Sequence, residues 1–141
     1  MDDLYQELIL HHNKNPLNKH DINNATHRAT GYNPLCGDQI TVSLIVQDGI
    51  IEDISFEGYG CAISTASSSL MTESVKGKTV EEINKLFEKV HSVFTGKSEE
   101  DLGKLDAFSN ISNYPARVKC ATLSWHTIMS AIKGNTECTT E

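Results

Sequence analysis

Long apolar runs are missing from this 141-residue sequence, and so are clusters of basic residues. No stretch approaches the roughly 18 to 20 apolar residues that a membrane-spanning helix needs, so we expect no membrane partner. Lys and Arg number 12 against 19 Asp and Glu, which gives a formal net charge of −7. Because binding to nucleic acid needs grouped Lys and Arg, this balance argues against nucleic acid as a main partner.

Signals for export, internal repeats and interdomain linkers are missing as well. The N-terminal residues are acidic and lack a basic segment followed by an apolar one, so we predict no secretory signal and expect a cytoplasmic location. The length is close to the commonest domain size, and 38% of the residues are hydrophobic against 22% charged. We therefore predict one globular domain over residues 1–141.

The periodicity of the apolar residues predicts an α+β fold. Ile40, Val42 and Leu44 alternate with polar residues ahead of Asp48-Gly49, which is typical of a tight hairpin turn, and Ile50, Ile54 and Phe56 follow it. Another short strand is expected near residues 25–30, and residues 135–141 are expected to be a frayed tail. Helical patterns cover residues 2–14, 61–75, 80–94 and 115–133. We predict a small antiparallel sheet of about three strands with helices packed on one face.

C-x-x-C pairs are absent, although the chain has four cysteines. Cys36 lies in a Pro/Gly turn two residues before Asp38, Cys61 follows G-Y-G where a strand leads into a helix, and Cys120 lies in the first turns of the last helix. Cysteines in a reducing cytoplasm bind metals or react as thiols more often than they form disulfides. Cys138, in the polar tail, is expected to be an incidental thiol.

Three interpretations of these thiols remain open from the residues alone, and one is that they carry out sulfur chemistry. Cys36, Asp38, Cys61 and Cys120 could together close a tetrahedral metal shell, such as that of Zn²⁺. Alternatively, each could be unrelated to the others: a surface thiol in a turn, a small residue at a helix start, and a core cysteine. Arg117, three residues before Cys120 and on the same side of its helix, could stabilise a thiolate or meet an anionic partner. His126 should face away from Cys120, and Trp125 is expected in the core.

The chain resembles the U-type iron–sulfur cluster scaffold family, and within it the SufU branch. The resemblance covers nearly the whole length. It rests on H-N-K-N-P-L-N at 12–18, N-P-L-C-G-D at 33–38, G-Y-G-C-A-I-S at 58–64, A-S at 66–67, M-T-E at 71–73 and R-V-K-C-A-T-L at 117–123. Lys119 stands where Isc-branch scaffolds have a histidine, and residues 97–116 resemble an insertion of SufU proteins.

The resemblance implies a zinc-dependent sulfurtransferase that serves iron–sulfur cluster assembly. Its sulfur donor would be a pyridoxal-phosphate cysteine desulfurase of the SufS type, and downstream iron–sulfur assembly proteins would be further partners. Cys36 would accept the persulfide sulfur and Arg117 would steady it. Cys36, Asp38, Cys61 and Cys120 would bind the zinc. The alternative within the family is a non-catalytic scaffold on which the same four residues build a [2Fe–2S] cluster.

Overall fold

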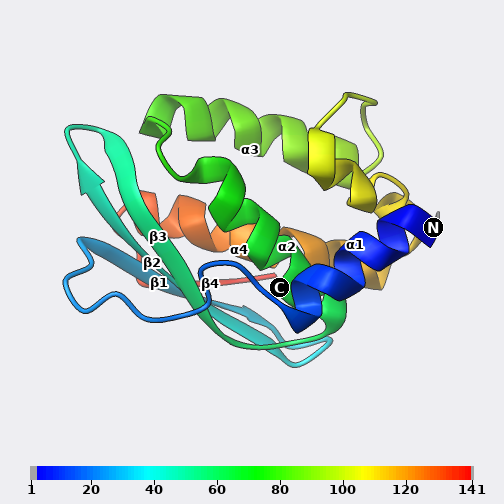
Figure 1. Cartoon of the computed structure of the whole chain (residues 1–141), viewed down its shortest axis with the longest axis horizontal. Coiled ribbons are helices and arrows are strands. Elements are labelled where there is room, and N and C mark those ends of the chain that lie inside the picture. Colours follow the sequence, from blue (N-terminus) through cyan, green and yellow to red (C-terminus); the bar gives the residue numbers. More distant parts are fainter. Residues whose placement is uncertain (1–2, 141) are drawn as a thin grey trace.

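A computed structural model describes residues 3–140 and confirms the α+β class. Within these residues four strands form one sheet in the order β3-β2-β1-β4, and the helices lie on one of its faces (Figure 1). In chain order the elements are α1 (Asp3–Lys14), β1 (His27–Asn33), β2 (Asp38–Gln47), β3 (Ile50–Tyr59), α2 (Ala62–Val75), α3 (Val80–Phe94), the 3₁₀ helices η1 (Gly103–Phe108) and η2 (Ile111–Asn113), α4 (Pro115–Ile132) and β4 (Glu137–Thr139).

The predicted hairpin is β2–β3. Asp48 and Gly49 both have positive φ, 54° and 76°, which is the conformation of a type I′ turn. A register shift between Ile45 and Val46 then changes which side chains of β3 point inward. Ile51 is therefore buried, whereas Ile50, which the alternation placed inward, is 40% exposed. That part of the prediction was wrong because the sequence pattern does not reveal the bulge.

The C-terminal tail is ordered, contrary to expectation. Residues Glu137–Thr139 form β4, which pairs in parallel with residues 30–32 of β1 and makes the otherwise antiparallel sheet mixed. In Figure 1 this short segment runs beside β1 close to the C-terminus. A three-residue polar strand carries almost no periodic signal, so the sequence alone predicted fraying there.

Two helices, α2 and α4, rest directly on the sheet, while α1 packs on α2 and α3 packs on α4. Trp125 of α4 is fully buried, as predicted. Helix α2 is buried around almost its whole circumference because its small side chains allow neighbouring elements to approach closely. Ser67, for example, donates a hydrogen bond to the carbonyl of Ala121 in α4. The close fit of α2 against α4 brings their N-terminal ends to the same edge of the sheet.

The motif at residues 12–18 fastens the N-terminal segment to α2. His12 Nδ1 lies 2.8 Å from Ser69 Oγ, and the backbone N–H of Leu17 donates to the same oxygen at 2.8 Å. Asn18 donates to the Thr72 hydroxyl. Among the described residues, none of the helices is long and apolar enough to cross a membrane.

A histidine pair lies between α3 and α4. The rings of His91 and His126 are 5.5 Å apart between centroids, and His126 also packs edge-on against Phe87 at 5.3 Å. Burial, and secondarily the charge of His91, lowers the pKa of His126. The folded protein therefore favours the neutral imidazole at this position.

We expect the free energy of unfolding to decrease as the pH falls from 7.5 to 5.5. The contribution of neutral His126 is complete above about pH 6.5, the pKa of an unfolded histidine, and is lost as the pH falls towards the lower folded-state pKa. Urea unfolding followed by Trp125 fluorescence, with a chelator present, measures this. The decrease should be smaller in His126→Gln and unchanged in the exposed control His20→Gln. Equal pH dependence in the wild type and His126→Gln would contradict the prediction.

Candidate metal centre

Three segments that are far apart in the sequence meet at one edge of the sheet. They are the turn between β1 and β2, the junction of β3 with α2, and the first turns of α4. One ligand atom each from Cys36, Asp38 and Cys120 lies within 4.8 Å of the other two. The convergence that the metal interpretation required is therefore present for these three residues.

The turn that carries Cys36 is held by the backbone of Asn33. The carbonyl of Asn33 accepts hydrogen bonds from the N–H groups of Cys36, at 3.3 Å, and Gly37, at 2.9 Å. Gly37 has φ of +74°, a conformation that glycine adopts without strain. The Cys36 side chain is exposed at the tip of this turn, whereas Cys120 is buried.

Cys61 is the N-cap of α2. It lies next to Cys120 and Asp38 but is not among the three residues whose ligand atoms lie within 4.8 Å of one another. Its backbone N–H donates to Asp38 Oδ1 at 2.9 Å, and its sulfur accepts the N–H of Ser64 at 3.4 Å. A hydrogen bond with the Cys120 thiol, assisted by backbone N–H groups at the helix start, lowers the pKa of Cys61 to about 6. The same hydrogen bond, together with burial, raises the pKa of Cys120. Without a metal, this hydrogen bond therefore favours the thiolate at Cys61 over the thiolate at Cys120.

Asp38 is buried, and both of its carboxylate oxygens accept an N–H. Oδ1 accepts the backbone N–H of Cys61, and Oδ2 accepts the side-chain amide of Asn33, each at 2.9 Å. The same amide nitrogen lies 3.4 Å from Cys120 Sγ. Asn33 is itself fully buried. The carboxylate is thus oriented by two other segments, and its remaining lone pairs are free to bind a cation.

A cavity of about 370 Å³ opens onto these residues. It is lined by Cys36, Cys61, Cys120 and Arg117, together with Gln6, Ile9 and Leu10 of α1 and Ala62 and Ile63 of α2. Arg117 is exposed, and its guanidinium carbon lies 5.2 Å from the centroid of the Tyr114 ring, which steadies the side chain at the cavity wall. Arg117 therefore lines the same cavity as Cys36, Cys61 and Cys120.

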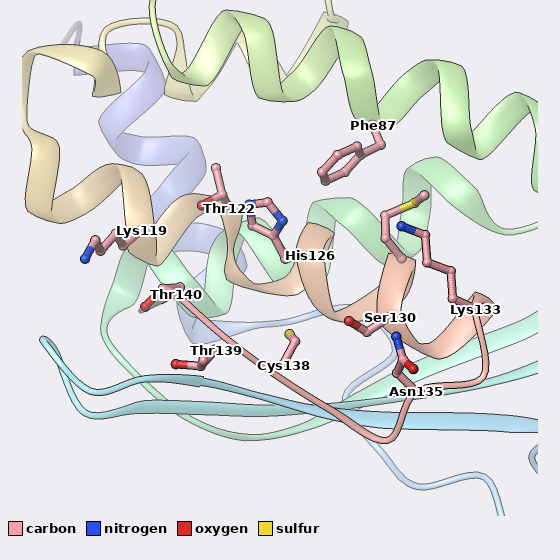
Figure 2. Close-up of a pocket in the computed structure, with 11 residues that line it drawn as sticks. Phe87, Lys119, Thr122, His126, Ser130, Lys133, Asn135, Cys138, Thr139 and Thr140 are labelled. Atoms are coloured by element: carbon pink, nitrogen blue, oxygen red, sulfur yellow. The ribbon is translucent and has the colours of Figure 1, made fainter.

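Lys119 lines a different cavity, of about 480 Å³, between α4 and the C-terminal segment (Figure 2). His126 and Cys138 line this second cavity too, so His126 faces away from Cys120, as predicted. Cys138 is half-buried, with its sulfur 3.5 Å from the Thr127 hydroxyl. Lys119 and Cys120 are adjacent in sequence, but they face opposite cavities because neighbouring residues on a helix diverge by about 100°.

The donor set suits zinc better than a hard cation. Thiolate sulfurs with one carboxylate are ligands of tetrahedral Zn²⁺ or of iron–sulfur clusters, whereas Mg²⁺ and Ca²⁺ prefer oxygen. A tetrahedral zinc brings its sulfur ligands to roughly 4 Å from one another. Cys36, Asp38 and Cys120 already lie near that separation, and Cys61 is next to Cys120. The residues present therefore fit the metal.

Comparison with known proteins identifies the family of this chain. Residues 4–121 match the family described as the NifU-like N-terminal domain. The chain belongs to this family. It is 39% identical to the "Zinc-dependent sulfurtransferase SufU" of Bacillus subtilis, over 94% of this chain and 91% of that protein. It is 42% identical to the "Iron-sulfur cluster assembly scaffold protein IscU" of Thermotoga maritima, over 92% of this chain and 93% of that protein.

A solved structure from Fervidobacterium islandicum AW-1 has the same fold. It is described as "Putative iron-sulfur cluster assembly scaffold protein for SUF system". The TM-score is 0.85 at 36% identity, and the alignment covers 89% of this chain and 94% of that one. Because relatives of similar identity are named sulfurtransferase and scaffold, sequence similarity does not choose between the two activities.

Sequence reasoning missed the side chain of Asn33. The residue stands in the N-P-L-C-G-D motif, which was the available signal, but its amide contacts Cys120, 87 residues away. Ser64 was also missed. Its buried hydroxyl has no hydrogen-bond partner and lies close above Gly60, beside Asp38.

Gly60→Ala should disturb the centre. A Cβ at this position would lie 2.6 Å from Asp38 Oδ1 and 3.0 Å from Ser64 Oγ, so the carboxylate must move. We expect a loss of about 1–3 kcal/mol in the free energy of unfolding together with less zinc bound per chain. Urea unfolding and metal analysis of the purified protein measure these two quantities.

Gly103→Ala is the matched control. Gly103 has φ of +65° and open space around it, so an alanine there costs roughly 1 kcal/mol in backbone strain without approaching the thiols. Zinc content should stay at the wild-type value in this variant. Unchanged zinc content in Gly60→Ala would show that Asp38 does not bind the metal.

Proposed function

We propose that this protein is a zinc-dependent sulfurtransferase that accepts persulfide sulfur from a cysteine desulfurase for iron–sulfur cluster assembly. The observation that carries the proposal is the contrast within one cluster: Cys36 is exposed on a turn, while Cys120 and Asp38 are buried and fixed by hydrogen bonds. The similarity to a relative named as a zinc-dependent sulfurtransferase supports it.

Cys36, Asp38, Cys61 and Cys120 are the proposed zinc ligands. Zinc would keep these thiols deprotonated and would compensate the negative charge that gathers where they meet Asp38. The cysteines among these ligands lie on elements of different kinds. Cys61 caps α2 and Cys120 lies on α4, and both helices pack against the sheet, whereas Cys36 lies on the turn that joins β1 to β2.

Sulfur transfer at Cys36 would be a thiol–disulfide exchange. The Cys36 thiolate attacks the terminal sulfur of the donor's cysteine persulfide, and a new S–S bond forms as the donor's S–S bond breaks. The donor cysteine leaves as a thiolate, and Cys36 becomes a persulfide, so no external oxidant or reductant is needed. The exposure of Cys36 allows the donor persulfide to reach it.

Arg117 is proposed to steady the sulfur on Cys36. It lines the same cavity as Cys36, and the Tyr114 ring fixes its planar head group near the opening. A cationic guanidinium beside a thiolate or persulfide anion favours the charged form that reacts. Arg117 would thus act by electrostatics rather than by proton transfer.

The surroundings of Cys36 suit the docking of a protein donor. Leu35, Tyr59 and Tyr114 are large apolar side chains near the three thiol-bearing segments, and they are exposed by 62%, 63% and 44%. Exposed apolar side chains that flank a reactive site are typical of protein-binding surfaces. We propose a pyridoxal-phosphate desulfurase of the SufS type as the donor, and downstream iron–sulfur assembly proteins as recipients.

Cys36→Ser should abolish transfer while retaining the fold, because Cys36 is exposed and its side chain supports no core contact. Incubation with a SufS-type desulfurase, pyridoxal phosphate and free cysteine should stimulate the desulfurase with wild-type protein but not with Cys36→Ser. Mass spectrometry should find one added sulfur atom on the peptide containing Cys36 of the wild type. Stimulation by Cys36→Ser equal to that by the wild type would refute the proposal.

Cys138→Ser is the matched thiol control. Cys138 lines the other cavity and approaches Thr127 rather than the proposed zinc ligands. This variant should keep full stimulation of the desulfurase and the same persulfide on Cys36. Equal loss in both variants would indicate that removal of a thiol perturbs the fold rather than the transfer step.

A scaffold for a [2Fe–2S] cluster is the second candidate. The 42% identity to a relative named as a scaffold favours it, and the same four residues could ligate a cluster. Protein purified without air distinguishes the two functions. One zinc per chain and no visible absorbance is expected for the sulfurtransferase, whereas brown protein with iron and sulfide would establish the scaffold.

A further inference from the structure

We propose that Asn33 is a positioning residue of the metal centre and that Thr140, at the end of the C-terminal strand, holds it in place. The inference rests on the proposed zinc site, since it concerns residues that orient the ligands. With this role for Thr140, the last strand becomes a structural part of the metal centre. This strand lies about a hundred residues after Cys36 and Asp38 in the sequence.

Asn33 contacts three of the four proposed ligands. Its side-chain nitrogen donates to Asp38 Oδ2 at 2.9 Å and to Cys120 Sγ at 3.4 Å. Its backbone carbonyl accepts the N–H of Cys36. The residue is fully buried, so water cannot replace these contacts. An amide nitrogen has two hydrogens, and this one directs them at the Asp38 carboxylate and the Cys120 sulfur.

Thr140 sets which way the amide of Asn33 faces. The Thr140 hydroxyl donates to Asn33 Oδ1 at 3.0 Å. Because a buried oxygen needs a donor, this bond favours the orientation in which the nitrogen points at Asp38 and Cys120. A rotated amide would aim its oxygen at the Asp38 carboxylate, and two oxygens that both accept hydrogen bonds would then repel one another.

The strand pairing delivers Thr140 to this position. Thr30 donates its backbone N–H to the carbonyl of Thr136 at 2.9 Å, and the N–H of Thr140 donates to the carbonyl of Tyr32 at 3.0 Å. These two hydrogen bonds lie at either end of β4 and hold it alongside β1. The second bond is to Tyr32, the residue before Asn33. In Figure 2 Thr140 lies on the C-terminal segment, near the end of α4 that bears Lys119. Lys119 immediately precedes Cys120 in the sequence.

Outer residues that orient metal ligands commonly change metal affinity about 10- to 100-fold when they are replaced. We expect Asn33→Ala to weaken zinc binding within that range. Thr140→Val should weaken it by roughly three- to tenfold, since the hydroxyl acts through Asn33. Thr140→Ser keeps the donor and should restore the wild-type affinity.

The measurement is zinc affinity by competition with a chromophoric chelator, on the full-length protein, with urea unfolding of the metal-free forms alongside. Thr41→Val is the matched control, because it removes a 2.8 Å hydroxyl contact with Thr30 in the same sheet, away from the centre. Weaker zinc binding in Thr140→Val, with wild-type affinity in Thr140→Ser and Thr41→Val, supports the proposal. It does so even if Asn33→Ala fails to fold.

Two results would overturn the inference, and they differ from each other. Wild-type zinc affinity in Thr140→Val, or the same loss in Thr41→Val, would remove the role of the C-terminal strand and leave the zinc centre intact. A wild-type protein that binds no zinc would refute the metal centre in the proposed function itself.

Discussion

The buried carboxylate of Asp38 is the constraint on which the site depends. A charged group that is only 2% exposed must be compensated by hydrogen bonds or by an opposite charge. Its two N–H donors come from the N-cap of α2 and from the end of β1, so the carboxylate links the sheet to the helix layer. These donors give each oxygen of the Asp38 carboxylate a hydrogen bond, but they do not neutralise its negative charge, which lies close to the sulfur of Cys120. A cation in the centre would resolve that arrangement.

The proposed ligands differ in burial, and this difference suits them to different roles. Cys120 and Asp38 are buried and hydrogen-bonded, whereas Cys36 is exposed on the turn between β1 and β2. A site that must both hold a metal and exchange sulfur with another protein needs both kinds of residue. The exposed apolar side chains near the thiols give that other protein a surface to contact.

Lys119 and Cys120 are adjacent in α4, but their side chains line two different cavities. Cys120 and Arg117 line one, and Lys119 lines the other. Lys119 therefore adds no ligand to the cysteine cluster in this conformation. The relatives carry both functional names, so the distinction between transfer and scaffolding depends on the ligand chemistry rather than on overall identity.

The sequence by itself determined the elements and the candidate ligands, because short-range patterns encode them. The turn at Asp48-Gly49 and the helical periodicity at residues 80–94 and 115–133 act within a few residues, and the structure has each of them. Tertiary structure alone decided the inward turn of Ile51, the ordering of β4, and the bridge from Thr140 through Asn33 to Cys120. These features depend on strand register and on hydrogen bonds that span up to 107 residues, which no local periodicity records.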